Sequence, residues 1–236
     1  MYLKKDKKVT AIILAAGAGI RMKSDVTKQR ISILGKRVLL RSVDAHVRCR
    51  LIDDITVVCR PDETDFVRDE LAFIDDKPIT VVTGGETRFE SACLGFNSIP
   101  DDVDYVSIHD AARCLVTSQM IEKVVFAAFE YGAATAATPM TDTVKLVDSD
   151  KKIKTTVPRE NLWAASTPQV FSTELYRRAM LKHKDSDGLP TDDNMLLEKI
   201  GISPVCVDVG KENIKLTTSE DILLAEFLIR RNNGEL

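Results

Sequence analysis

Short apolar runs alternate with amphipathic segments along about the first 140 residues of the chain. The apolar runs are rich in β-branched residues and predict strands, whereas the segments between them carry apolar residues at three- and four-residue spacing and predict helices. The predicted strands are Val9–Ala15, Ile55–Cys59, Ile79–Thr83, Tyr105–His109 and Ala133–Thr138. The predicted helices are Arg37–Arg50, Glu63–Ala72, Phe89–Ser98 and Ser118–Tyr131.

This alternation predicts an α/β fold with a mainly parallel sheet. Strands joined through helices form right-handed crossovers, which place helices on both faces of the sheet. Ligands of such sheets bind beyond the carboxyl ends of the strands. We therefore expect the chemistry directly after Ala15, Thr83, His109 and Thr138.

The pattern changes after about residue 140. Two short runs, Thr143–Val147 and Ile153–Val157, predict a hairpin arm over about 141–160 that stands off the body. Exposed hairpin edges often pair with another chain. The remaining predictions are a helix at Ser172–His183, a helix from Asp192 capped by Thr191, a strand at Val205–Val209 and a helix at Ser219–Arg230 capped by Ser219. With no repeat or flexible linker, residues 1–236 are predicted to form a single domain plus this arm.

The first predicted strand leads into a glycine-rich segment. Gly17 and Gly19 allow backbone N–H groups to approach an anion closely, and Arg21 and Lys28 add two cations that can neutralise a polyphosphate. The segment is not a P-loop, because no Gly-Lys-Ser/Thr follows. Nor is it a dinucleotide fingerprint, because Met22 stands where the third glycine belongs. A plain turn between a strand and a helix remains the alternative.

Two other strand ends carry candidate ligands. Gly84-Gly85 allows a flat base to lie against the backbone, with Glu86 and Ser91 able to bond its edge. The alternative is a helix-entry turn in which Glu86 favours the helix dipole.

Asp110, at the tip of the next strand, is placed to hold Mg²⁺ over a phosphate. The small Ala111 beside it leaves room for a ligand, and the alternatives for Asp110 are a helix cap or a partner of Arg113. His109 is not chosen as catalytic, because its side chain alternates away from that of Asp110. Lys215 and Arg159 are isolated cations that indicate little by themselves.

Composition narrows the setting. An apolar content of 44% permits a full core, and nothing in a net charge of −3 suggests a nucleic-acid surface. No apolar stretch approaches the length of a membrane span. The five scattered cysteines fit reduced thiols in a cytosol. We therefore predict a cytoplasmic protein without nucleic-acid or membrane partners.

Taken together, the motifs resemble those of the 2-C-methyl-D-erythritol 4-phosphate cytidylyltransferases of the non-mevalonate isoprenoid pathway, over about residues 9–230. They are Leu14-Ala15-Ala16-Gly17-x-Gly19-x-Arg21-Met22, Lys28-Gln29, Gly84-Gly85-Glu86-x-Arg88-x-x-Ser91, His109-Asp110-Ala111-Ala112-Arg113, Asp142-Thr143-Val144-Lys145, Thr167-Pro168-Gln169, Thr191-Asp192 and Asn213-Ile214-Lys215.

The resemblance implies a Rossmann-like nucleotidyltransferase sheet and a reaction in which a sugar-alcohol phosphate attacks the α-phosphorus of CTP. It implies that the CTP-binding residues are Ala15, Ala16, Gly17, Gly19, Gly85, Glu86, Ser91 and Ala111, and that the catalytic residues are Arg21, Lys28, Lys215 and Asp110. Asp110 would lie on the side of a divalent cation, Mg²⁺ or another, whereas a metal role for Glu212 is doubtful.

The resemblance also implies a homodimer with shared active sites. In this family the arm crosses to the partner subunit, so Thr143 and Arg159 would hold the methylerythritol phosphate together with Thr167.

The chain departs from the family pattern at a few positions. Cys114 replaces the usual Pro, Thr27 stands where Pro is common, Arg30 replaces an aromatic or apolar residue, and Asp193 replaces the usual Glu. None of these departures removes a predicted phosphate ligand.

The nearest rival is a ribitol-5-phosphate cytidylyltransferase, which shares the fold and the CTP loop. Its central motif tends to read His-Asp-Ser-Val-Arg, whereas Ala111-Ala112 here favours the isoprenoid enzyme. UTP- or GTP-dependent sugar nucleotidyltransferases share only the architecture. A non-catalytic nucleotide-binding regulator is a further alternative, and a nicotinamide oxidoreductase is disfavoured by the missing glycine.

Overall fold

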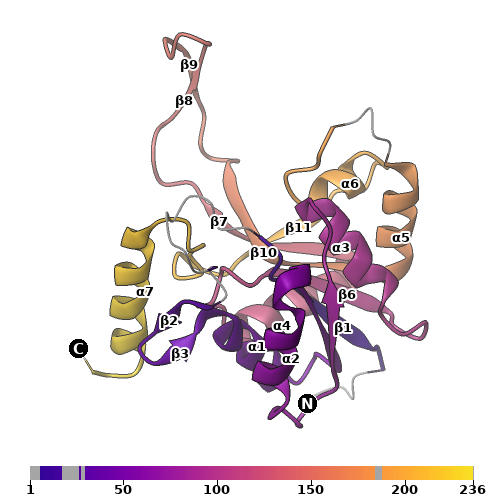
Figure 1. Cartoon of the computed structure of the whole chain (residues 1–236). Coiled ribbons are helices and arrows are strands. Elements are labelled where there is room, and N and C mark those ends of the chain that lie inside the picture. The colour runs from indigo at the N-terminus through magenta and orange to yellow at the C-terminus, as the bar shows by residue number, and fades with distance from the viewer. Residues whose placement is uncertain (1–5, 18–26, 28–29, 184–187, 236) are drawn as a thin grey trace.

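The computed structural model describes residues 6–17, 27, 30–183 and 188–235. Its central feature is a seven-stranded sheet with the strand order β11-β7-β10-β6-β1-β4-β5 (Figure 1). The strands are β1 (Val9–Leu14), β4 (Asp54–Cys59), β5 (Ile79–Thr83), β6 (Tyr105–Asp110), β7 (Ala133–Pro139), β10 (Trp163–Ser172) and β11 (Val205–Asp208). The helices are α1 (Val38–Arg48), α2 (Thr64–Leu71), α3 (Arg88–Asn97), α4 (Ser118–Tyr131), α5 (Thr173–Lys182), α6 (Asn194–Glu198) and α7 (Ser219–Asn232).

The α/β class and the mainly parallel sheet are confirmed. β1 pairs in parallel with β4 and β6, β4 with β5, and β7 with β11. The strands and helices predicted from the first part of the chain all form, with ends that differ by a residue or two.

One long strand was not predicted from the sequence. β10 lies between β6 and β7 and runs antiparallel to both. Its pairing with β7 shifts register between Ala165 and Gln169. Pro168 falls inside this irregularity, and a proline within a run argues against a regular central strand. The bulge lets the strand continue past that proline and re-aims the side chains beside it.

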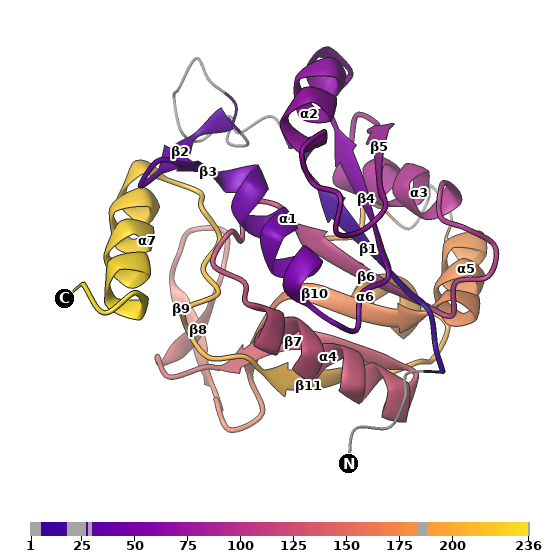
Figure 2. The same cartoon turned by 90° about the horizontal axis from the view of Figure 1, so that it is seen from below.

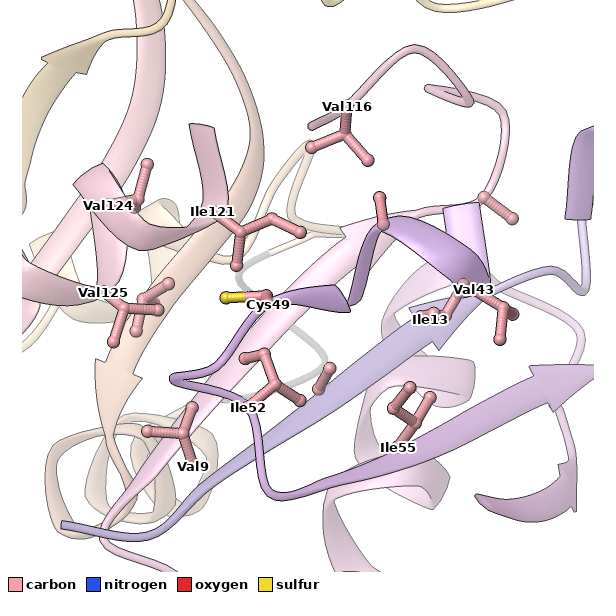
Figure 3. Close-up of a cluster of buried hydrophobic side chains, with 14 of the residues drawn as sticks. Val9, Ile13, Val43, Cys49, Ile52, Ile55, Val116, Ile121, Val124 and Val125 are labelled. Carbon is pink, nitrogen blue, oxygen red and sulfur yellow. The ribbon is translucent and has the colours of Figure 1, made fainter. Parts of the chain in front are cut away.

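Side chains of β1 alternate between the two faces of the sheet. Ala11 and Ile13 pack with residues of α1, α2 and α4, whereas Ile12 and Leu14 pack with residues of α3, α5 and α6. Figure 2 shows α1 and α4 crossing one face. The core on that face is drawn in Figure 3, where Ile13 lies close to α1. Because helices cover both faces of the sheet, successive residues of a strand are all buried, which explains why the strand sequences are apolar throughout.

The predicted arm is present as β8 (Val144–Val147) and β9 (Ile153–Val157), an antiparallel pair. It stands off the body at the top of Figure 1. The arm exposes three aliphatic side chains to solvent, those of Leu146, Val147 and Ile153.

A second small antiparallel pair consists of β2 (Ser32–Ile33) and β3 (Lys36–Arg37). Ile33 of this pair packs in a buried cluster that includes Ala225 of α7. Within the described ranges, no helix is both long and apolar enough to cross a membrane.

Two predicted helix caps were wrong. α6 begins two residues after Asp192, and Thr191 donates its hydroxyl to the sulfur of Met195 rather than capping the helix. α7 is capped at Thr218, whose N–H donates to Asp221, so Ser219 is already the first helical residue.

Lys77 holds the loop that follows α1. Its ammonium group donates to the backbone carbonyls of His46, Cys49 and Ile52, with N···O distances of 3.2 Å to His46 and 2.7 Å to Ile52. The carbonyls of His46 and Cys49 lie at the C-terminal, negative end of α1, where a cation is favourable. One side chain thereby fixes the turn between α1 and β4.

We expect Lys77→Met to lower the free energy of unfolding by about 1–3 kcal/mol, because hydrogen bonds from a charged donor are lost. Urea denaturation at neutral pH measures this. Lys123→Met, at an exposed position of α4, is the control and should change stability by no more than about 0.5 kcal/mol. Equal stabilities of the two variants would contradict the role given to Lys77.

His46 is a buried histidine on α1. Its Nδ1 donates to the carbonyl of Ser42 at 2.8 Å, while its Nε2 has no partner among the described residues. Burial lowers the pKa of His46 to about 4, so the folded protein keeps this ring neutral at physiological pH. The unfolded chain takes up a proton near pH ~6.5.

The free energy of unfolding should therefore fall as pH drops from about 6.5 towards 4, since only the unfolded state then gains the proton. At pH 5 the loss attributable to His46 is about 2 kcal/mol, from ~1.4 kcal/mol per pH unit. His46→Met should flatten the pH dependence by this amount. Urea unfolding of both proteins at pH 7.5 and pH 5 measures it, and parallel pH profiles would contradict the assignment.

Candidate active site

The carboxyl ends of the parallel strands meet at one edge of the sheet, as predicted. Leu14 at the end of β1 lies in register with Asp110 on β6 and with Val58 on β4. Cys59 at the end of β4 lies in register with Thr83 on β5. The predicted ligand segments after β1, β5 and β6 therefore share one edge.

The Gly-Gly turn lies against the segment that follows β1. A Cβ on Gly84 would come within 2.7 Å of Ala16 Cβ and 2.8 Å of Ser91 Oγ, so only glycine fits between them. The Ser91 hydroxyl accepts from the N–H of Gly85 at 3.2 Å. The structure thus brings together two of the predicted CTP-binding segments, and it uses Ser91 to shape the turn.

Glu90, not Glu86, caps the helix that begins here. Glu90 forms a capping box with Thr87 and also accepts from the N–H of Glu86 at 2.8 Å. The side chain of Glu86 is exposed. The hydrogen-bonding role at the helix start thus belongs to Glu90, and the side chain of Glu86 is accessible to a ligand.

The structure describes only part of the glycine-rich segment. Ala15 is buried and donates its N–H to Val58 at 2.7 Å, and a Cβ on Gly17 would meet nothing within 4 Å. Gly19, Arg21 and Lys28 lie outside the described residues. Ala111 is fully buried and donates to the carbonyl of Leu14 at 3.0 Å.

Asp110 lies between two cations in a polar pocket. Arg88 Nε is 3.1 Å from its Oδ1, and Lys215 Nζ is 2.6 Å from its Oδ2. Burial alone would raise the pKa of Asp110, but the charges of Arg88 and Lys215 outweigh burial and hold this pKa well below its ordinary value. Asp110 is therefore a fixed negative charge. Arg88 belongs to the Gly-Gly motif, but the sequence did not predict its contact with Asp110.

Arg88 also forms an ion pair with a second, buried carboxylate, that of Asp193. Its Nη1 is 2.7 Å from Oδ2 of Asp193, and the hydroxyl of Tyr176 donates to Oδ1 of Asp193 at 2.7 Å. Tyr176 and Asp193 are both buried. Burial opposes the charge of Arg88, but the two carboxylates of Asp193 and Asp110 outweigh it and raise the pKa of Arg88 above its ordinary value. The charges therefore alternate along a chain from Asp193 to Lys215.

Lys215 reaches this pocket because its segment is tied to the end of β6. Arg113 Nη1 donates to the carbonyl of Asn213 at 2.9 Å, and Leu216 N–H donates to the carbonyl of Ala112 at 2.9 Å. The amide of Asn213 donates to the carbonyl of Thr167 at 2.8 Å. Arg113 thus positions the backbone that carries Lys215; no hydrogen bond or ion pair joins its side chain to Asp110 among the described contacts.

Thr167 holds Asp110 from the bulge of β10. Its Oγ1 accepts from the N–H of Asp110 at 3.0 Å and lies 3.1 Å from Nδ1 of His109. Nε2 of His109 lies 3.3 Å from the carbonyl of Arg113, which fits a neutral ring protonated at Nε2. Burial lowers the pKa of His109 well below its ordinary value. His109 is therefore a support for Thr167, in agreement with its exclusion as a catalytic base.

A polar wall faces Asp110 across the pocket. Gln169 Nε2 and Asn194 Nδ2 both donate to Oδ2 of Asp192, each at 2.8 Å. Thr191, next to Asp192, lines the same pocket as Lys215. The position of these residues in the pocket was not predicted, because Thr191-Asp192 in the sequence also fits an ordinary helix start.

The predicted base-binding residues, the arm residues and Glu212 are not among the residues that line this pocket in the single chain. Thr143 and Arg159 are exposed at the base of the arm, where Arg159 donates to the carbonyl of Thr141. Glu212 pairs with Arg231 and accepts from Asn232 Nδ2 at 3.0 Å, at the end of α7. Its carboxylate is thus engaged by α7.

Comparisons with known proteins identify the family of the chain. Residues 9–231 match the sequence profile of the family described as 2-C-methyl-D-erythritol 4-phosphate cytidylyltransferase. A relative of that name from Caldanaerobacter subterraneus is 40% identical over 225 residues, which span 94% of this chain and 99% of the relative. One from Syntrophus aciditrophicus is 37% identical over 235 residues, 97% of this chain and 99% of the relative.

Solved structures agree as well. The 4-diphosphocytidyl-2C-methyl-D-erythritol synthase of Anaerococcus prevotii aligns with a TM-score of 0.84 at 31% identity, covering 95% of this chain and 99% of that one. The cytidylyltransferase of Francisella tularensis aligns with a TM-score of 0.78 at 31% identity, covering 94% and 99%. With this length of match and the Asp110 pocket at the expected strand end, the chain belongs to the 2-C-methyl-D-erythritol 4-phosphate cytidylyltransferase family of CTP-dependent nucleotidyltransferases.

Proposed function

We propose that the chain transfers the cytidylyl group of CTP to 2-C-methyl-D-erythritol 4-phosphate, giving 4-diphosphocytidyl-2-C-methyl-D-erythritol and pyrophosphate. The observation that carries this proposal is that Asp110, Arg88 and Lys215 line one pocket. This pocket lies at the same edge of the sheet as the Gly84-Gly85 turn, which follows β5. An anion-binding pocket beside a turn that accepts a flat base fits a nucleotide and a second phosphate at once.

In this proposal CTP lies along the edge formed by β1 and α3. Backbone groups of Ala15, Ala16 and Gly85, with Glu86, recognise the base, and Ser91 fixes the turn that presents them. Gly17 and Gly19, with the cations Arg21 and Lys28, hold the triphosphate. Ala111, which is fully buried next to Asp110, is proposed to contribute to CTP binding through its small size.

Lys215 is proposed to guide the attacking phosphate. The side chain of Lys215 is 39% exposed, so its ammonium group can keep Asp110 as a partner and turn another N–H towards an incoming anion. The attack brings two anions together, and catalysis consists mainly of neutralising charge and aligning the reacting atoms. No general base is needed, because a phosphate monoester is already ionised at neutral pH.

The donor set fits a divalent cation held mostly by substrate. In the described part of the chain no group of three or more His, Cys, Asp or Glu side chains could enclose a metal ion. Magnesium binds with one or two carboxylates plus phosphate oxygens and water, and Asp110 supplies one such carboxylate. A bound Mg²⁺ would neutralise the triphosphate. Glu212 is a poor second ligand, because it does not line the pocket that holds Asp110 and instead pairs with Arg231 at the end of α7.

The arm is proposed to complete the partner's pocket in a homodimer. Thr143 and Arg159 lie on an arm that leaves its own body, and the exposed aliphatic residues of β8 and β9 favour pairing with a second chain. There they would bind the sugar phosphate opposite Thr167, whose hydroxyl also holds Asp110. A cytoplasmic location is proposed with this assignment, because its substrates are soluble phosphates.

Pyrophosphate release from CTP and Mg²⁺ tests the proposed reaction. Methylerythritol 4-phosphate and ribitol 5-phosphate are offered in parallel as acceptors. We expect release with methylerythritol 4-phosphate alone. Release with ribitol 5-phosphate alone would reject the acceptor, and CTP binding without release from either would reject the chemistry.

Lys215→Met should lower kcat by about 10²–10³-fold, the scale of losing one group that stabilises developing charge. The control is Lys211→Met, which removes an exposed lysine of the same segment that bonds Thr141 at 3.0 Å, and its kcat should change little. Steady-state kinetics with both substrates measures this. Similar kcat values for the two variants would remove Lys215 from the proposed machinery.

Arg159→Ala should raise the KM for methylerythritol 4-phosphate more than the KM for CTP, because the lost cation faces the acceptor. Steady-state kinetics with each substrate varied in turn measures this.

A mixture of the Arg159→Ala protein with the Lys215→Met protein tests whether the arm crosses to the partner subunit. Each mixed dimer would contain one pocket with both residues intact, so re-assembled equal mixtures should recover up to about a quarter of the native activity. No recovery, with mixed dimers shown to form, would place the arm in its own subunit's pocket.

A further inference from the structure

A buried carboxylate that the proposed reaction does not use lies at the end of β4. Glu63 ends the short 3-10 turn Pro61–Glu63, and it is only 3% exposed. Its Oε1 accepts from the hydroxyl of Thr27 and from Nε of Arg30, the latter at 3.1 Å. These two residues flank Lys28-Gln29 in the sequence.

The two flanking residues are also tied to each other and to α2. The N–H of Arg30 donates to the carbonyl of Thr27 at 3.0 Å. The guanidinium of Arg30 lies over the ring of Phe66, 4.1 Å from its centroid, a stacking arrangement that attracts a cation to an aromatic face. Glu63 is thus the point at which both residues are joined to the β4 end of the sheet.

Stability alone does not account for this carboxylate. Its second oxygen, Oε2, is buried and has no hydrogen-bond partner in the part of the chain that the structure describes. A half-satisfied buried carboxylate costs free energy that an apolar residue of similar size would not. Residues that break local rules in this way are expected at functional sites.

We propose that Glu63 is a positioning residue for CTP: by holding Thr27 and Arg30, it fixes the chain on both sides of Lys28. This inference rests on the proposed triphosphate role of Lys28. A cation on a chain with fixed ends loses less conformational freedom when it binds a phosphate, so the binding energy is kept for affinity. Glu63 itself touches no substrate in this account.

The test compares Glu63→Ala and Glu63→Gln with Glu70→Gln as the matched control. Glu70 lies on α2 and forms an ion pair with Arg37 at 3.0 Å. The guanidinium of Arg37 lies 4.8 Å from the centroid of the Phe66 ring, over which Arg30 also lies. The control therefore removes a comparable charge near Phe66 without touching Thr27 or Arg30.

We expect Glu63→Ala to raise the KM for CTP, and the Kd for CTP measured by calorimetry without acceptor, by about tenfold. The KM for methylerythritol 4-phosphate should stay within about twofold of the native value. Glu63→Gln keeps an oxygen for Thr27 but loses the charge facing Arg30, so its effect on CTP should be intermediate. Glu70→Gln should leave both KM values unchanged.

If Glu63 had a merely structural role, its variants would contain less folded enzyme, which would lower the apparent kcat, or they would shift both KM values together. Either result would overturn the inference. If Glu63→Ala does not fold, the split between the two KM values in Glu63→Gln decides. Lys28→Ala is measured in parallel. A CTP defect in Lys28→Ala but none in the Glu63 variants overturns this inference alone. No defect in Lys28→Ala overturns the proposed triphosphate role on which it rests.

Discussion

The carboxylate of Asp110, held between Arg88 and Lys215, is the interaction on which the site depends. It joins the tip of β6, the start of α3 and a segment 105 residues further along the chain. Behind it, Asp193 and Tyr176 anchor Arg88 in the core. Because the charges alternate, the pocket keeps a cation at its mouth without burying an unpaired charge.

This arrangement links the fold to the chemistry. The parallel strands bring the Gly84-Gly85 turn beside Ala16, and the bulge of β10 brings Thr167 beneath Asp110. The proposed reaction needs a place for a base, cations for phosphates and a fixed acceptor phosphate. In the proposal the base lies at strand ends and at the start of α3, which are rigid elements suited to precise alignment. Lys215, proposed to guide the acceptor phosphate, lies on a segment that is tied to the end of β6. The proposed arm would add the acceptor contacts from a second chain.

The sequence predicted the parallel strands, the helices and the sheet edge at which the strands end, because burial on two helical layers leaves a strong apolar pattern. β10 was missed because Pro168 interrupts its pattern, and only its neighbours β6 and β7 make it a strand. Arg88 and Asp193 could not be paired from sequence, since their contact is set by tertiary packing. Arg30 departs from the family pattern, and its contacts with Glu63 and Phe66 were likewise visible only in the folded chain.

The most direct test of the central claim is a pH titration in which carbon-13 NMR monitors the carboxyl group of Asp110. The variant Asp110→Asn assigns its signal. Two adjacent cations should keep this group ionised after exposed aspartates have taken up protons near pH ~4. The account predicts that the Asp110 signal shows no titration step while the protein remains folded above about pH 3. A titration midpoint near or above the ordinary aspartate value would contradict it.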